Sequence, residues 1–294
     1  YFLKNLVFYP NMDTCPNMKI LWNLLIFPLF YCPYAIFTSV SADVEKTLIS
    51  WVIMEDRNIQ AGSILTLQDE DQFDGIIFAE KMDDKWMAGS DNWKRSENNQ
   101  ENYPSWDSGV GSLVQMAIVY QKDRISIYRD GLPYVSYPAK NINLLSTQTN
   151  FAVFGKRHMG GGGGISGMIE DARIYGRALT QNEIKALVPN EVSGIEPYAW
   201  WNFEDDASEQ TGRFPHHELR IGAKVENGKL MLHRGAVLIA AKSEEIARRS
   251  SQVPLLDEPY MPETPKMPND PPDNWPIFHL FHPDKDLGAP YDPN

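Results

Sequence analysis

The chain has 294 residues, of which 43% are hydrophobic and 12% aromatic, enough for a packed core in one large or two ordinary domains. It carries 27 basic and 39 acidic side chains, a formal charge of -12, which argues against nucleic acid or an anionic membrane as a general partner. Both cysteines, Cys15 and Cys32, lie within the first 42 residues, so the rest of the chain has no thiol for a disulfide or a zinc site.

The first 42 residues have the pattern of an export signal. Met18 and Lys19 precede an apolar stretch at 20–37, and small residues follow as far as Ala42. A short basic start, an apolar middle and small residues at a cleavage site are typical of a secretory signal peptide. The alternative, an uncleaved membrane anchor, is less favoured because one Asn and two Pro interrupt the apolar run. We therefore expect 1–42 to be removed from a secreted, periplasmic or extracellular protein that has no membrane contact afterwards.

From residue 47 to 175, short runs of β-branched and aromatic residues alternate with Gly, Asp, Asn and Pro, which is typical of antiparallel strands. One helix is predicted, where Thr180 and Glu183 form a capping box and Pro189 blocks continuation. We expect an all-β fold, an antiparallel two-sheet sandwich with one short helix. Strands are predicted at 48–54, 63–67, 75–79, 114–120, 124–129, 134–137, 151–154 and 166–175.

The later strands resemble those of a known family. The sequence reads Phe-Ala-Val-Phe-Gly at 151–155, then Gly-Met-Ile-Glu-Asp-Ala-Arg-Ile-Tyr at 167–175 and Arg-Ala-Leu-Thr at 177–180. This series resembles the laminin G-like, concanavalin A-type jelly roll, and weaker matches extend over most of 43–187. The resemblance implies a jelly-roll sandwich and says much less about the ligand.

The strands that usually open such a domain come late in this chain. Ala-Trp-Trp-Asn-Phe-Glu at 199–204 and the turn at Asn227-Gly228 follow the helix, whereas the Ser-Trp-Val strand at 50–52 comes soon after the signal. We interpret this order as a circularly permuted sandwich, with 198–241 supplying the strands absent at the start. The alternative is a second sandwich that begins at residue 196. With the permuted order, the sandwich is expected to span 43–245.

A proline-rich tail follows the sandwich. Residues 253–294 hold 11 of the 21 prolines, a spacing that favours extended, semi-rigid chain over a packed core. We therefore expect a linker at 246–276 that leads to another domain.

Residues 277–294 are similar to the opening of glycoside hydrolase family 32, the β-fructosidases. The similarity rests on Ile-Phe-His-Leu-Phe-His-Pro at 277–283 and Gly-Ala-Pro-Tyr-Asp-Pro-Asn at 288–294. It implies that 277–294 begins a β-propeller, that Asp292 is the catalytic nucleophile and that Asn294 lines the sugar pocket. Tyr291 replaces the usual first Asn of that family's turn, and the alternative is an ordinary Asp-Pro turn in a proline-rich tail.

A retaining glycosidase also needs a second, protonated carboxyl group about 5 Å from the nucleophile. The family's Arg-Asp-Pro and Glu-Cys motifs, which supply the stabiliser and the acid, are absent from this sequence. The parent protein is therefore expected to be a glycoside hydrolase, and this chain alone is expected to be inactive.

Aromatic residues gather among polar ones at 85–93, a segment that we interpret as a loop, and Tyr103 and Trp106 lie beyond it. Exposed rings of this kind stack on sugars, because the C–H groups of a sugar face pack against an apolar plane. We expect Trp93 and Trp106 to bind carbohydrate in this way, whereas Trp86 fits a core position at least as well.

Four acidic residues, Asp69, Glu70, Asp71 and Asp74, could supply oxygen ligands for Ca²⁺, which the laminin G resemblance permits. The alternative is a solvated acidic turn, which is more common. The six histidines show no metal spacing. We predict no metal site and no cofactor, with Ca²⁺ as the one candidate ion.

Together these patterns predict an exported carbohydrate-active protein, in which a laminin G-like domain accompanies a glycosidase that hydrolyses β-fructosides. Its partner would be a fructan or another glycan. The alternative is a secreted sugar-binding or adhesion module with no catalytic activity, in which the proline-rich tail is a spacer. A hydrolase within the sandwich itself is disfavoured, because no paired carboxylates such as Glu-x-Asp-x-x-Glu occur.

Overall fold

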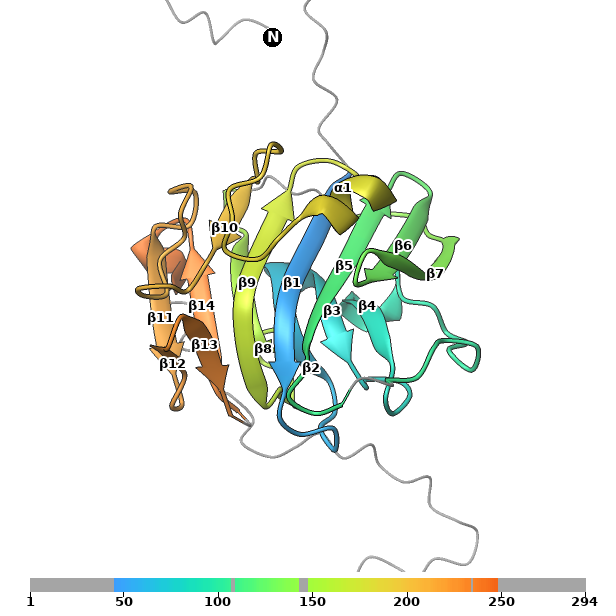
Figure 1. The fold of residues 1–294 in the computed structure, drawn as a ribbon, viewed down its shortest axis with the longest axis horizontal. Coiled ribbons are helices and arrows are strands. Elements are labelled where there is room, and N and C mark those ends of the chain that lie inside the picture. Colours follow the sequence, from blue (N-terminus) through green and yellow to red (C-terminus); the bar gives the residue numbers. More distant parts are fainter. Residues whose placement is uncertain (1–44, 107–108, 143–147, 234, 248–294) are drawn as a thin grey trace, which may run out of the picture. The chain divides into compact units, whose positions relative to one another are not determined.

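A computed structural model describes residues 45–106, 109–142, 148–233 and 235–247 (Figure 1). The predicted signal peptide, most of the predicted linker and the segment at 277–294 lie outside these residues. Within them, no helix is long and apolar enough to cross a membrane.

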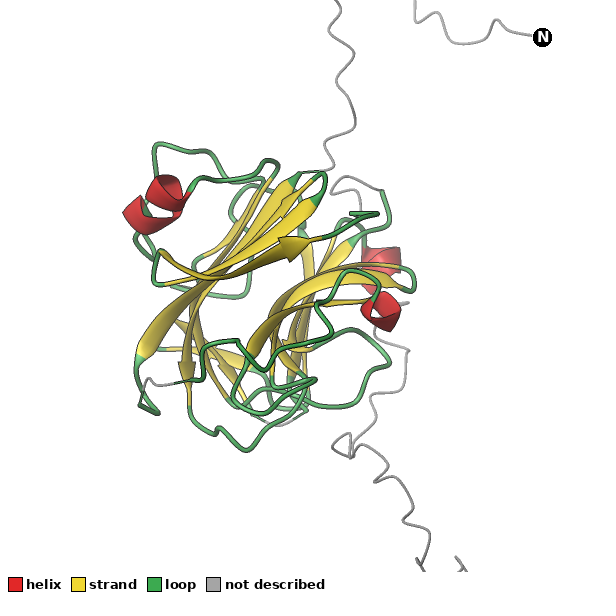
Figure 2. Cartoon of the chain, turned by 90° about the vertical axis from the view of Figure 1, so that its right-hand side faces the viewer, coloured by secondary structure: helices red, strands yellow, loops and turns green. Residues whose placement is uncertain are grey.

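Two antiparallel sheets form the two layers of a sandwich (Figure 2), which confirms the predicted all-β class. In the first sheet the strand order is β12-β13-β9-β1-β5-β6-β7, and β10 also pairs with β9; in the second the order is β11-β14-β8-β2-β3-β4. The first sheet contains β1 (Lys46–Met54), β5 (Leu113–Gln121), β6 (Arg124–Arg129), β7 (Leu132–Pro138), β9 (Gly167–Tyr175), β10 (Ala199–Trp201), β12 (Lys224–Glu226) and β13 (Lys229–Leu232). The second contains β2 (Gly62–Asp69), β3 (Gln72–Phe78), β4 (Trp86–Ser90), β8 (Phe151–Lys156), β11 (His216–Arg220) and β14 (Val237–Ala241).

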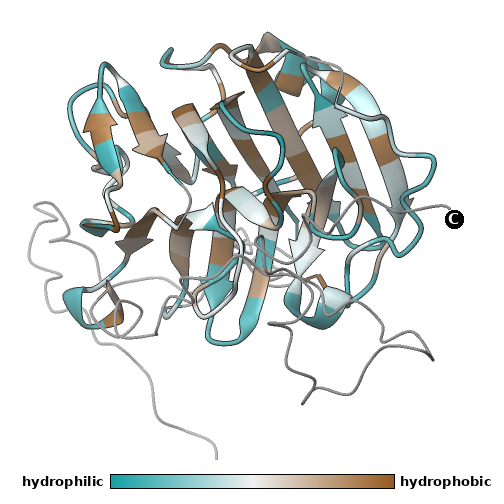
Figure 3. Ribbon diagram, turned by 90° about the horizontal axis from the view of Figure 1, so that it is seen from below, coloured by the Kyte–Doolittle hydropathy of each residue, from teal (hydrophilic) through white to brown (hydrophobic). Residues whose placement is uncertain are grey.

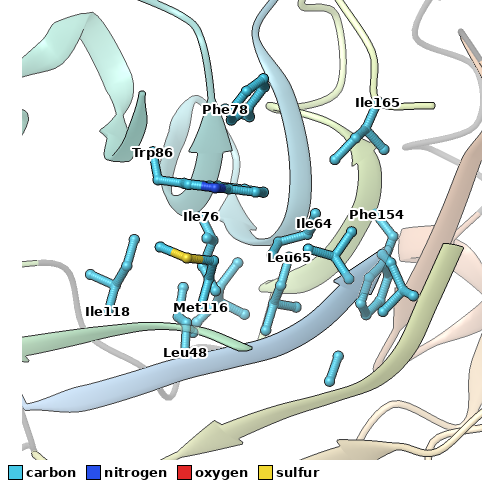
Figure 4. Packing of buried hydrophobic residues seen from close by; sticks show 14 of the residues in the cluster. Leu48, Ile64, Leu65, Ile76, Phe78, Trp86, Met116, Ile118, Phe154 and Ile165 are labelled. Carbon is cyan, nitrogen blue, oxygen red and sulfur yellow. The ribbon is translucent and has the colours of Figure 1, made fainter. Parts of the chain in front are cut away.

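The core lies between the two sheets, because successive side chains of a strand point to opposite faces. In β1, for example, Leu48 and Val52 enter the main core, whereas Ile49 and Trp51 point to the outer face. Figure 4 shows how inward side chains of both sheets meet in this core. Coloured by hydropathy, the strands carry apolar residues interspersed with polar ones, whereas much of the loop chain is polar (Figure 3).

The single predicted helix is present as α1 (Gln181–Ala186), and its capping box is confirmed. The backbone N–H of Glu183 donates to Thr180 Oγ1 at 3.3 Å, and the Thr180 N–H donates to Glu183 Oε2 at 2.7 Å. Ile184 packs with Ile49 and Trp51 on the outer face of the first sheet. The helix therefore covers apolar side chains of β1 that would otherwise face water.

The late segment completes the same two sheets. β14 pairs with β8, while β13 and β10 pair with the two halves of one edge of β9. Trp201 of β10 is fully buried against Phe154 of β8, with ring centroids 5.2 Å apart. The alternative of a second sandwich starting at residue 196 is therefore wrong, because the late strands belong to the same two sheets; the circular permutation stays a prediction.

One element differs from the prediction. Residues 85–93 were expected to form a loop, but Trp86–Ser90 is the edge strand β4, paired with β3. Trp86 is buried in the core against Phe78, at a centroid distance of 4.9 Å.

A buried ion pair on the outer face of β9 fixes the chain that follows α1. The Arg173 guanidinium donates to Asp171 Oδ1 at 3.0 Å and to Oδ2 at 2.7 Å, and both side chains are fully buried. The central carbon of the Arg173 guanidinium, Cζ, lies 5.3 Å from the ring centroid of Trp51 and 4.9 Å from that of Trp200. Burial opposes the charged form of Arg173, but the bonds and charge of Asp171 outweigh it and raise the pKa of the guanidinium.

The same two side chains bind backbone groups of the connection between α1 and β10. Arg173 donates at 2.9 Å to the carbonyls of both Val188 and Glu191. Asp171 Oδ2 accepts from the Asn190 N–H at 2.7 Å and from the Trp200 indole at 3.0 Å. The pair therefore positions the segment that leads into the late strands.

We expect a chain that lacks 196–241 to lose cooperative unfolding and to aggregate, because the edges of β8 and β9 and the core around Phe154 become uncovered. Circular dichroism melts and size-exclusion chromatography measure this. A matched chain ending at residue 247 should stay monodisperse and cooperative. A soluble, cooperatively melting deletion variant would contradict the one-sandwich fold.

We expect Arg173→Ala to lower the free energy of unfolding by roughly 3–5 kcal/mol, because it leaves the Asp171 carboxylate buried without its cation. The control is Arg177→Ala, which breaks the exposed pair with Glu183 and should cost about 1 kcal/mol or less. Urea unfolding followed by tryptophan fluorescence measures both. Equal losses in the two variants would contradict this role of the buried pair.

Candidate functional site

The two tryptophans predicted to bind sugar have different environments. Trp93 is 42% exposed, whereas Trp106 is 3% exposed and packs against Phe78 and Trp86 at centroid distances of 5.8 Å. The expectation that Trp106 presents its ring to a ligand is therefore wrong, because tertiary packing places it in the core. Asp292 and Asn294, the predicted nucleophile and its neighbour, lie outside the described residues.

Trp93 ends a single turn of 3-10 helix, η1 (Asp91–Trp93), directly after β4. Asn92 and Trp93 both have left-handed backbone conformations, with φ of 49° and 52°. This region costs an L-residue roughly 1–2 kcal/mol, and a bulky residue there is unusual. The surrounding structure must hold the turn in place, and the result is an indole presented to solvent.

A network of buried charges holds η1. Arg95, just beyond the turn, pairs with both Asp91 and Asp74, and its guanidinium also donates to the Phe73 carbonyl at 2.8 Å. Burial would raise the pKa of Asp91, but hydrogen bonds and charge from Arg95 and Lys94 outweigh it and hold the pKa below its ordinary value. Asp91 therefore stays charged at neutral pH and anchors the turn.

The network crosses the sandwich. Lys46 of β1 pairs with Asp74 of β3 at 2.8 Å, with both side chains 1% exposed. Lys46 Nζ also lies 4.6 Å from the ring centroid of Tyr120 in β5. The turn that carries Trp93 is thus tied through Arg95 to strands of both sheets.

This arrangement corrects the calcium expectation. Asp74 is buried between Lys46 and Arg95, so it does not gather with the acids of the β2–β3 turn. Asp69 accepts from Thr149 at 2.6 Å. Across the described ranges, no group of three or more His, Cys, Asp or Glu could hold a metal ion.

One cation approaches the exposed indole. Lys81, in the β3–β4 loop, places Nζ 5.2 Å from the Trp93 ring centroid and donates to Asn98 Oδ1 at 2.5 Å. The ring therefore has an ammonium group nearby that can donate to a ligand hydroxyl. An aromatic plane with a donor at its side suits the apolar face and the hydroxyl rim of a sugar.

The sequence did not indicate a pocket at the loops that follow β1 and β3. Its volume is about 490 Å³, within the usual range for small-molecule sites. Arg57 donates to Asp84 Oδ1 at 3.2 Å and to the Trp106 carbonyl at 3.0 Å, so the buried Trp106 supports one wall through its backbone. The lining residues are Glu55, Asp56, Arg57, Asn58, Asp84 and Val110.

The β3–β4 loop contributes to both features. Lys81 stands beside Trp93, and Asp84, three residues later, forms part of the pocket lining. The Trp106 N–H donates to the Asp84 carbonyl at 3.0 Å, which fixes that end of the loop. The pocket lining comes from three loops that are far apart in sequence, so no local motif could have indicated it.

Comparison with known proteins adds the family. A family model for the concanavalin A-like lectin/glucanases superfamily matches residues 34–185. No curated protein sequence gives a significant match.

Several solved structures are similar in part. A heptameric SAP-like pentraxin from Limulus polyphemus is 16% identical, with a TM-score of 0.36 over 50% of this chain and 71% of the pentraxin. A putative carbohydrate binding protein from Bacteroides ovatus is 10% identical, with a TM-score of 0.40 over 68% of this chain and 54% of that protein. Domain 4 of an extracellular GH43 arabinanase from Geobacillus stearothermophilus, solved with arabinotriose, is 16% identical, with a TM-score of 0.34 over 48% of this chain and 65% of that domain.

The family match covers more than half of the chain and coincides with β1 to β9 and most of α1. The chain therefore belongs to the concanavalin A-like lectin/glucanases superfamily.

Proposed function

We propose that this chain is part of an exported carbohydrate-active protein, and that its sandwich binds a glycan through Trp93 and the adjoining loops. The observation that carries the proposal is the exposed Trp93 indole on a left-handed turn. Strained backbone persists only where the surrounding structure enforces it, and such residues cluster at ligand-binding positions. Membership of a superfamily named for lectins and glucanases supports a glycan as the ligand.

In this proposal the pocket supplies polar groups to the same glycan, since the β3–β4 loop contributes Lys81 to the surroundings of Trp93 and Asp84 to the pocket. Glycan recognition combines an apolar plane with hydrogen-bonding groups that fix orientation. Carboxylates accept bonds from vicinal hydroxyls, and the partly exposed Arg57 guanidinium adds donors. In this proposal the sandwich binds the glycan, and a separate catalytic domain hydrolyses it.

The proposed catalytic partner is a β-fructosidase-like domain that begins at residue 277, joined through a linker at 246–276. Support comes from the sequence alone, namely the His-containing motif at 277–283 and the Asp-Pro-Asn sequence at 292–294. In this proposal Asp292 is the nucleophile, Asn294 lines the sugar pocket, and the glycan is a fructan. Arg-Asp-Pro and Glu-Cys motifs in the coding sequence after Asn294 would support it, and a different domain there would contradict it.

We expect the full chain to bind a polysaccharide from a glycan screen that includes inulin and levan, and Trp93→Ala to weaken that binding about tenfold or more through lost stacking. Trp93→Tyr should retain most of the affinity because it keeps an aromatic plane. Microarray screening followed by isothermal titration measures both variants. Flat responses to every glycan would overturn the proposed function.

A second variant separates binding from folding. Trp93→Gly should unfold at the same temperature as the original chain or a higher one, because glycine adopts φ near 52° without the penalty of about 1–2 kcal/mol. The same variant should lose glycan affinity. A marked drop in melting temperature would show that Trp93 is needed for folding and would contradict its role as a presented ligand contact.

A further inference from the structure

The pocket at Arg57 and Asp84 has an unbalanced charge. Three carboxylates line it, from Glu55, Asp56 and Asp84, against the one guanidinium of Arg57. Four of its lining residues already bond to one another, since Arg57 pairs with Asp84 at 2.9 Å and Asp56 Oδ1 accepts from the Asn58 N–H at 2.8 Å. The Glu55 carboxylate is exposed at its rim.

The single cation is already paired within the protein, so it offsets one of the three carboxylate charges and leaves the pocket with a net negative charge. The Arg57 guanidinium bonds to Asp84 and to the Trp106 carbonyl. The two paired side chains are partly exposed, Arg57 at 37% and Asp84 at 39%. A ligand carboxylate or sulfate would compete with Asp84 for Arg57. The ligand anion would also lie close to the remaining pocket carboxylates. Salt only partly screens repulsion between charges that are closer than the Debye length, which is about 8 Å at physiological salt.

We infer that the pocket accepts an uncharged or cationic glycan and excludes anionic ones, so that its ligand is a neutral or amino sugar and not a uronic, sialic or sulfated one. This inference rests on the proposed glycan-binding function and specifies its ligand class. Ligand hydroxyl or ammonium groups donate to the carboxylates, which only accept. The overall charge of -12 acts in the same direction at longer range.

The test uses two matched polymer series on the full chain. One is inulin, carboxymethyl inulin and aminated inulin, and the other is dextran, dextran sulfate and diethylaminoethyl dextran. We expect each anionic derivative to bind severalfold more weakly than its neutral parent, because two of the three pocket carboxylates have no compensating cation in the pocket lining. The cationic derivatives should bind at least as tightly as the parents.

Two double variants test whether the discrimination against anionic polymers arises at the pocket. Glu55→Gln with Asp56→Asn removes two pocket charges and keeps the acceptor for the Asn58 N–H, and it should narrow the gap between neutral and anionic polymers severalfold. Glu196→Gln with Asp205→Asn removes two exposed charges outside the pocket and should leave the gap unchanged. Affinities are measured by biolayer interferometry at several salt concentrations.

The possible outcomes distinguish failure of this inference from failure of the proposed glycan-binding function. Binding of neutral and anionic polymers with equal affinity, or equal narrowing in the two double variants, would overturn the inference and leave glycan binding intact. Failure of every polymer in these series and in the wider screen to bind would overturn the glycan-binding function, and this inference with it.

Discussion

The buried pair of Asp171 and Arg173 is the interaction on which the organisation of the sandwich depends. It lies on the outer face of β9, between the rings of Trp51 and Trp200, and binds backbone groups of the connection between α1 and β10. A buried charge is costly unless it is paired and fully hydrogen-bonded, and here the guanidinium and the carboxylate satisfy each other and the loop. The chain after α1 is thereby directed back to β9, where the late strands begin.

A second buried network connects the fold to the candidate site. Lys46 and Asp74 join the two sheets, and Arg95 links Asp74 to Asp91 in the turn that ends at Trp93. The turn keeps its unfavourable backbone conformation because the ion pair between Arg95 and Asp91 ties the residues on either side of Asn92 and Trp93 to each other. Rigid anchoring of an exposed ring lowers the entropy lost when a ligand binds, since the indole is already in position. The core and the presented ring are thus parts of one electrostatic arrangement.

Sequence patterns predicted the class of fold, the capping box of α1 and the role of the late strands, because each depends on local periodicity or on turn chemistry. They missed β4, since small and polar residues around Trp86 resemble a loop. They also misplaced Trp106, whose burial is decided by packing against distant strands. The pocket could not be predicted, because Arg57, Asp84 and Val110 come from separate loops that meet only in the folded sandwich.

The shared edge of β9 has a consequence for synthesis. Residues 167–175 pair on one side with β1, more than 100 residues earlier, and on the other with β13 and β10, which emerge from the ribosome later. While 199–241 are still being translated, one edge of each sheet remains unpaired and the aromatic core around Phe154 lacks its cover. Long-range pairing of this kind is slow, and exposed strand edges invite association between chains. Among the described strands, those of the sandwich that are translated last are therefore the ones that protect the nascent sheets from neighbouring chains.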